Sequence, residues 1–153
     1  MSEQLPRPVK KVLDPEFGIG LEALANAEGT NQLVHSKGVS YDFGPVKYVA
    51  ISGLAAVDQK MKPLGVGDVR EQTRIILEDM VATLKEEGGT IDDVFRVRVY
   101  VVGLDNERLR IIHEERAKVF HKDHYPASTL VEVQALILPE LLVEIDCDAL
   151  IVR

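Results

Sequence analysis

The sequence of 153 residues contains a single cysteine, Cys147. One thiol cannot form a disulfide within the chain, and this cysteine content fits a reducing compartment such as the cytoplasm. Cys147 lies on the apolar side of an alternating segment. We therefore expect it to be a small buried hydrophobe and not a reactive thiol.

Long hydrophobic runs are also missing. No segment approaches the roughly 18 consecutive apolar residues that a membrane-spanning helix needs. The first 17 residues carry charges and contain no apolar stretch of signal-peptide length, so we expect no export and a cytoplasmic location. With 46% hydrophobic and 28% charged residues, the composition is that of one globular domain able to bury a core.

Positive charge is in deficit. The chain has 18 Lys and Arg against 25 Asp and Glu, which gives a formal net charge of −7. Neutralising phosphates requires a basic stripe, and this balance leaves few cations with which to build one. The sequence therefore disfavours nucleic acid as a partner. It disfavours a ribonuclease for the same reason, and shows no clear acid/base pair in a basic groove.

Two segments near the C-terminus alternate in period two, as half-buried strands do. In the second segment, 142–152, the positions from Val143 to Ile151 on one side are apolar, and the other side carries Glu144, Asp146 and Asp148. A sheet face with these carboxylates cannot be the dry core of a monomer. We expect it to meet water, cations or another subunit.

The rest of the chain predicts an α+β domain with the order β-β-(β)-α-β-α-β-β. Strands are expected at 33–41, 46–53 and 91–102, with a short extended piece at 55–57, and helices are expected at 68–86 and 105–121. The predicted apolar stripes are Val69, Thr73, Ile76, Met80, Val81 and Leu84 in the first helix and Leu109, Ile112, Ala117 and Phe120 in the second. In the strand at 91–102, one face is expected to hold Phe95, Val97, Val99 and Val101, and the other Val94, Arg96, Arg98 and Tyr100. Residues 1–32 show no sustained periodicity apart from a short helical pattern at 20–27. We interpret them as an N-terminal extension of a domain that spans 33–153.

The helices should lie on one face of the sheet, because βαβ crossovers are right-handed. The other face would then be uncovered. Its expected members are Arg96, Arg98, Tyr100, Ser128, Leu130, Glu132, Glu144 and Asp146. Arginines on one strand beside carboxylates on two others are typical of an oligomer interface with a polar cleft.

Five segments resemble the YjgF/RidA (reactive intermediate deaminase) family in order and spacing. They are 49–53, 72–80, 92–101, Tyr125–Val133 and 143–146. The resemblance implies a chorismate-mutase-like α+β fold that forms homotrimers, whose uncovered sheets close into a central barrel with three clefts between subunits. Active members hydrolyse imines and enamines released by pyridoxal-phosphate enzymes without a cofactor of their own. Some members carry an endoribonuclease label.

The resemblance also assigns functional positions. Glu144 matches the glutamate that orients the attacking water, and Ser52 matches a serine that precedes a glycine. His35 falls near the position of a tyrosine, and His113 near that of an asparagine. His113 also lies beside the apolar stripe of its helix, where an exposed or structural histidine is the simpler interpretation.

The chain departs from the family at Ser128. Active members have an arginine there, which binds the substrate carboxylate bidentately, whereas a serine hydroxyl carries no charge. Leu130 replaces the family's cysteine. Arg98 is a candidate for the lost cation, although an ion pair with Glu132 or Glu144 across strands is the commoner role of such a residue.

Two hypotheses for the function follow. The first is a deaminase-type hydrolase of a small substrate, in which Glu144 positions water and Ser128 or Ser52 holds a polar group. The second is a non-catalytic trimeric protein with a small-molecule-binding or regulatory role, which keeps the cleft between subunits and has lost the chemistry. No metal is expected: His121, Asp123 and His124 have metal-ligand chemistry, but a solvated helix end explains them more simply.

Overall fold

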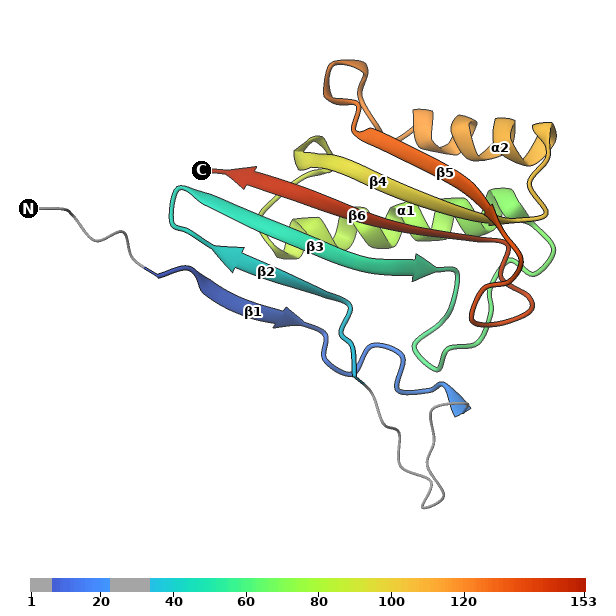
Figure 1. Ribbon diagram of the computed structural model, residues 1–153, viewed down its shortest axis with the longest axis horizontal. Coiled ribbons are helices and arrows are strands. Elements are labelled where there is room, and N and C mark those ends of the chain that lie inside the picture. Colours follow the sequence, from blue (N-terminus) through green and yellow to red (C-terminus); the bar gives the residue numbers. More distant parts are fainter. Residues whose placement is uncertain (1–6, 23–33) are drawn as a thin grey trace, which may run out of the picture.

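The computed structural model describes residues 7–22 and 34–153, which form a six-stranded sheet of order β1-β2-β3-β6-β4-β5 with helices on one face (Figure 1). The strands are β1 (Val9–Leu13), β2 (Gly38–Asp42), β3 (Val46–Ala55), β4 (Val94–Val102), β5 (Ala127–Val133) and β6 (Val143–Val152); the helices are α1 (Val69–Glu86) and α2 (Asn106–Ala117). The expected α+β architecture is confirmed, and so is the order of elements from β2 onward, except that the piece expected at 55–57 is not a separate strand: β3 continues to Ala55, and Val57 makes only an isolated bridge to Pro63.

Strand β6 lies in the middle of the sheet, antiparallel to both β3 and β4. The β4–β5 pair is parallel, with α2 as its crossover. Both helices cover the same face, as the right-handed crossovers required (Figure 1). Because β6 has a covered and an uncovered side, its alternation appears directly in its burial: Val143 and Ile145 are buried, and Glu144 and Asp146 lie on the open side.

The N-terminal segment contains a strand that the sequence did not predict. β1 pairs antiparallel with β2 and extends the sheet at its edge. The sequence of β1 lacks the apolar alternation of a half-buried strand, because four of its five residues are exposed and only Leu13 is buried. The predicted strand at 33–41 begins later, at Gly38, and the helix predicted at 20–27 falls mostly outside the described residues.

Helix α1 packs on the covered face as its apolar spacing predicted. Asp68 caps it, because its side chain accepts a hydrogen bond from the Glu71 backbone N–H. Of the predicted stripe, the buried members are Val69, Thr73, Ile76, Met80 and Leu84, whereas Val81 is 37% exposed. The buried stripe of α1 is therefore narrower than the apolar spacing of its sequence predicts.

Helix α2 departs from its predicted stripe. It ends at Ala117, and Leu109 and Ala117 are exposed, although Ile112 is buried as predicted. Two charged residues, Glu115 and Arg116, are buried instead. An apolar pattern cannot reveal them, because their burial depends on partners elsewhere in the fold.

The predicted strand faces are wrong at the start of β4 and throughout β5, whereas the rest of β4 has the predicted faces, with Val97, Val99 and Val101 buried. In β4 the register shifts between Val94 and Arg96, so Val94 is buried and Phe95 is 47% exposed on the open side. In β5, three residues expected on the open face, Ser128, Leu130 and Glu132, lie on the helix side, because the parallel register pairs Ser128 with buried Val97. The alternation of a strand shows which residues share a side, but it does not show which of the two sides faces the helices.

Candidate functional site

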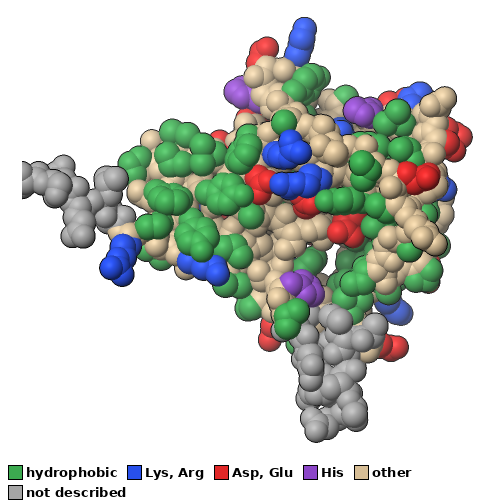
Figure 2. Space-filling view, in the orientation of Figure 1, with side chains coloured by type: hydrophobic (Ala, Val, Ile, Leu, Met, Phe, Trp, Pro, Cys, Tyr) green, Lys and Arg blue, Asp and Glu red, His purple; other side chains and the backbone are tan. Residues whose placement is uncertain are grey.

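The open face of the sheet carries a charged network at its centre (Figure 2). Arg98 donates to Asp146 at 2.5 Å and to Asp148 at 3.0 Å. The Tyr48 hydroxyl donates to Asp148 at 2.7 Å, and the Tyr100 hydroxyl to Asp146 at 3.2 Å. Hydrogen bonds to the two carboxylates raise the pKa of Arg98. The guanidinium is therefore held between two anions.

This pairing corrects the expectation for Arg98. Its partners are Asp146 and Asp148, and not Glu132 or Glu144. Glu132 lies on the other side of the sheet, where it accepts a hydrogen bond from the Leu104 backbone N–H at 2.8 Å. Two carboxylates already neutralise Arg98, which makes it a poor candidate for a substrate-binding cation.

Glu144 lies on the open face, opposite Tyr100 of β4 and Ala55 of β3. Its carboxyl lies directly over Gly53, where an added Cβ would come within 1.9 Å of Oε1. Burial, followed by the nearby charge of Asp146, raises the pKa of Glu144. Within the described part of the chain no cation forms an ion pair with it. Gly53 thus leaves the space that this half-buried carboxyl occupies.

Ser52 precedes that glycine and is fixed by the backbone of the segment entering β2. Its Oγ donates to the Ser36 carbonyl at 2.7 Å, and its N–H donates to the Lys37 carbonyl at 2.8 Å. His35 lies at the start of the same segment, with its ring edge-on to Phe17 at 6.1 Å between centroids. The structure therefore brings Gly53 to Glu144, while Ser52 is bonded to the backbone at Ser36 and Lys37 and His35 packs against the N-terminal turn.

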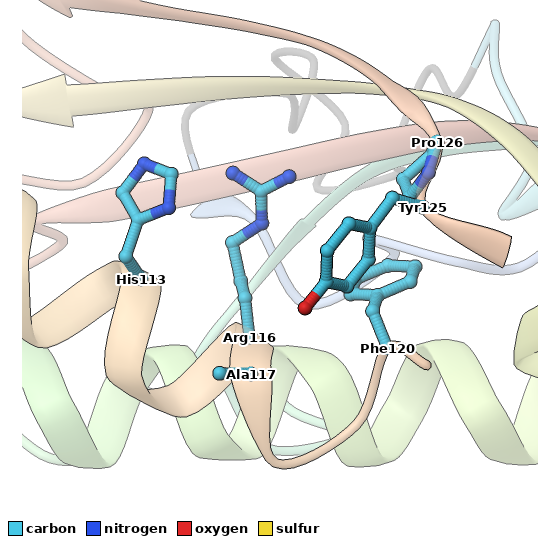
Figure 3. A pocket seen from close by; sticks show the side chains of 6 residues that line it. All are labelled: His113, Arg116, Ala117, Phe120, Tyr125 and Pro126. Atoms are coloured by element: carbon cyan, nitrogen blue, oxygen red, sulfur yellow. The ribbon is translucent and has the colours of Figure 1, made fainter. Parts of the chain in front are cut away.

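A cavity of about 260 Å³ lies on the other side of the sheet, between α2 and the start of β5 (Figure 3). Its walls are His113, Arg116, Ala117, Phe120, Tyr125 and Pro126. The Arg116 side chain projects from α2 between His113 and Tyr125 (Figure 3). Apart from His113 and Arg116, the walls are mainly apolar.

Arg116 is the charged group of this cavity, and it is only 8% exposed. Nη2 donates to the Oγ of Ser128 at 3.0 Å, and the guanidinium carbon lies 5.9 Å from the centre of the Phe120 ring. Nη1 is buried and has no hydrogen-bond partner among residues 7–22 and 34–153. Over the same ranges no carboxylate forms an ion pair with Arg116. Burial lowers the pKa of Arg116.

Sequence reasoning missed Arg116, although a signal for it exists. The residue lies four positions after Ile112 and four before Phe120, both of which are buried. A helix repeats its face at this spacing, so Arg116 belongs to the buried stripe. A cation on a buried stripe is unusual enough to be taken as a candidate site residue.

The predicted site residues thus form two groups on opposite faces of one chain. His113 and Ser128 meet at Arg116, with Leu130 on the same side, packed against the core. Burial and the charge of Arg116 lower the pKa of His113. Ser52, Arg98 and Glu144 lie on the other side, and His35 lies at the edge near Phe17. The sheet separates the two groups within one chain.

The predictions about metals and membranes concern other regions. His121 contacts Asp92 through Nδ1 at 2.6 Å. No group of three potential metal-binding side chains is found within the described ranges. Among the described helices, none is long and apolar enough to cross a membrane.

The sequence matches a known protein family and several of its members. The model of a family described as Endoribonuclease L-PSP matches residues 36–151. A RutC family protein of Pyrococcus horikoshii is 31% identical over 102 residues, covering 67% of this chain and 78% of the relative. The RutC family protein UK114 of Drosophila melanogaster is 32% identical over 102 residues, covering 67% of this chain and 71% of the relative.

Solved structures give the same result. A Mycobacterium tuberculosis protein described as a member of the YjgF/YER057c/UK114 family has 31% identity and a TM-score of 0.65, over 94% of this chain and all of that one (100%). RidA from an Antarctic Psychrobacter has 24% identity and a TM-score of 0.64, over 78% of this chain and 89% of its own, and shows the shared fold.

Proposed function

This chain belongs to the YjgF/RidA family and has its chorismate-mutase-like fold, and from that membership we propose a cofactor-independent deaminase-type hydrolase of small imines and enamines. The observation that carries the proposal is the Glu144 carboxyl, half-buried over Gly53 without a paired cation in the described chain. Such a carboxyl is available to accept a proton from water, and its raised pKa makes it a stronger base than an ordinary glutamate.

The reaction would proceed by addition of water to the carbon of the C=N bond. Glu144 accepts a proton from the water as its oxygen bonds to carbon, and returns that proton to the nitrogen, which gives an amino alcohol. Glu144 then takes the proton of the new hydroxyl and passes it to the amino group as the C–N bond breaks, which releases ammonia and leaves the carbonyl product. An enamine first takes a proton at carbon and enters the same path as an imine. No electron acceptor is needed, because the carbon keeps its oxidation state.

We propose that a second copy completes the site, in the cleft between subunits of a homotrimer. Ser128 and Glu144 lie on opposite faces of one chain, so a substrate held near Ser128 can meet only the Glu144 of a neighbour. Exposed apolar residues on the open face support this association: Phe95, Leu150 and Val152 are each at least 43% exposed. The open faces of three copies would enclose a central barrel.

The alternative is a non-catalytic protein that binds a small molecule in the same cleft. The charge that active relatives place at 128 is absent, and Arg98 is already neutralised by Asp146 and Asp148, which favours this alternative. The endoribonuclease function in the family's description receives less support, because the chain carries a net charge of −7.

The test is turnover of 2-iminopropanoate generated in situ, with ammonia release measured against a buffer blank. We expect the wild type to exceed the blank, and Glu144→Gln to lose at least about 100-fold, the usual contribution of a general base. Glu140→Gln, which removes an exposed carboxylate, is the matched control and should keep full activity. A rate equal to the blank, or one unchanged by Glu144→Gln, contradicts the proposal for this substrate.

A further inference from the structure

We propose that the cavity at Arg116 binds a small organic monocarboxylate with an apolar group, and that Arg116 of α2 supplies the cation missing at position 128. This inference deepens the proposed function by naming the substrate class and a binding residue. Binding can be measured without turnover, so the two proposals can fail separately.

The first support is the state of the guanidinium. Arg116 is 8% exposed, and its Nη1 has no hydrogen-bond partner in the described chain. A buried cation without a counter-ion is unfavourable, and the Phe120 ring at 5.9 Å compensates for only part of the lost hydration. An anion that enters the cavity would supply the missing partner.

The second support is the contact with Ser128. Its hydroxyl accepts a 3.0 Å hydrogen bond from Nη2, which fixes one nitrogen, while the buried Nη1 has no partner in the described chain. A small residue at 128 also leaves room for the arginine that arrives from the helix. The charge is therefore placed at the start of β5 by a different element, with Ser128 as a positioning residue.

The third support concerns the class of ligand. The cavity contains one cation and mainly apolar walls, including Phe120, Tyr125 and Pro126. Burial and Arg116 lower the pKa of His113, so His113 adds no charge near neutral pH. One positive charge matches a monocarboxylate better than a doubly charged phosphate. The cavity volume of about 260 Å³ is just below the volumes of pockets that bind drug-sized ligands, so the cavity suits a small metabolite.

The test is isothermal titration of the full chain with phenylacetate, acetate and phenylacetamide. Phenylacetate has both a carboxylate and a ring, acetate lacks the ring, and phenylacetamide lacks the charge. The three ligands therefore test the role of the cation and the role of the apolar walls separately. We expect phenylacetate to bind once per chain, with acetate at least about tenfold weaker because it lacks the ring. Phenylacetamide should bind at least about tenfold weaker because it lacks the charge.

Variants then assign the site. Arg116→Met should weaken phenylacetate at least about tenfold, and Ser128→Ala by about threefold, the ranges for charged and neutral hydrogen bonds. Lys118→Met removes an exposed cation of the same region and should leave affinity unchanged. Circular dichroism and the assembled mass verify that Arg116→Met folds and assembles. Should it misfold, Arg116→Lys, which keeps the charge but loses the planar fork, should bind several-fold weaker than wild type.

Each contrary result has its own meaning. Equal binding of acetate and phenylacetate overturns the apolar part of the proposal. The role of the cation is overturned if phenylacetamide binds as tightly as phenylacetate, or if both Arg116 variants bind phenylacetate as tightly as the wild type. Dissociation of the assembly in Arg116→Met, with no carboxylate binding by the wild type, shows that Arg116 serves an interface and overturns the site. Saturable binding at Arg116 without imine turnover keeps this inference and removes only the hydrolase.

Discussion

Arg116 and Ser128 are joined by a 3.0 Å hydrogen bond across twelve residues of chain, from helix α2 to strand β5. The guanidinium therefore has one nitrogen on the serine and one without a partner in the described chain. Under the proposal above, Arg116 supplies from the helix the cation that the family resemblance assigns to position 128.

The first prediction is that the two residues can exchange roles. Arg116→Ser alone should lower activity or carboxylate affinity at least about tenfold. Adding Ser128→Arg should recover part of that loss, because the charge returns to the same region from the strand. Titration calorimetry of the single and double variants measures the recovery. A double variant as weak as Arg116→Ser would show that the positions are not equivalent.

The second prediction concerns Gly53. In Gly53→Ala the new methyl would come within 1.9 Å of the Glu144 Oε1, so the carboxyl must move away. The clashing atoms belong to a flexible side chain, and we expect folding to survive with only a small change in melting temperature. Turnover should fall at least about tenfold, because the base is displaced. Wild-type turnover in Gly53→Ala would show that this placement has no catalytic role.

A third prediction follows from the raised pKa of Glu144. A base must be ionised, so the acid limb of the rate profile should lie above the ordinary value of 4.5 for glutamate. Ammonia release measured between pH 4 and 9 locates this limb. Activity that stays constant down to the ordinary value would exclude Glu144 as the group that sets it.

The raised pKa of Glu144 also predicts how the stability of the folded protein changes with pH. Folding favours the protonated carboxyl, so the stability from this group is complete below the unfolded pKa and is lost as pH rises through the folded one. Glu144→Gln should therefore raise the melting temperature at pH 8. The difference should vanish at pH 4, where the wild-type group is already protonated. A destabilised variant at pH 8 would contradict the assigned shift.

The fifth prediction concerns Arg98. Arg98→Met leaves Asp146 and Asp148 close together without their shared cation, so the melting temperature should fall. If Arg116 is the substrate cation, turnover per correctly assembled molecule should stay within about threefold of wild type. A large loss of turnover in a folded and assembled variant would return the role of substrate cation to Arg98.

The sequence was most informative where one strand has two distinct environments. β6 has the core on one side and the open face on the other, so its alternation predicted both sides correctly. β5 is an edge strand with a mostly exposed burial pattern, and the same kind of alternation left its orientation undetermined. The sequence therefore predicts Ser128 on the same face as Glu144, although the sheet separates them within one chain.

Other features depended on contacts that no local pattern records. The register shift after Val94 exchanges the sides of Val94 and Phe95. The buried Glu115 is paired with Arg70 and Lys118, and these partners make the burial of a charged side chain possible. Arg116 lies at helical spacing with Ile112 and Phe120, but its role is recognisable only once β5 brings Ser128 to it.

The central claim, a site shared between two copies, is tested most directly by mixing two inactive variants. Arg116→Met and Glu144→Gln chains are unfolded, combined in equal amounts and reassembled, and imine hydrolysis is compared with each variant reassembled alone. A site that takes Arg116 from one chain and Glu144 from its neighbour predicts recovery of about a quarter of wild-type activity by random association. Reassembled mixtures of the correct mass that stay as inactive as either variant would contradict the shared site.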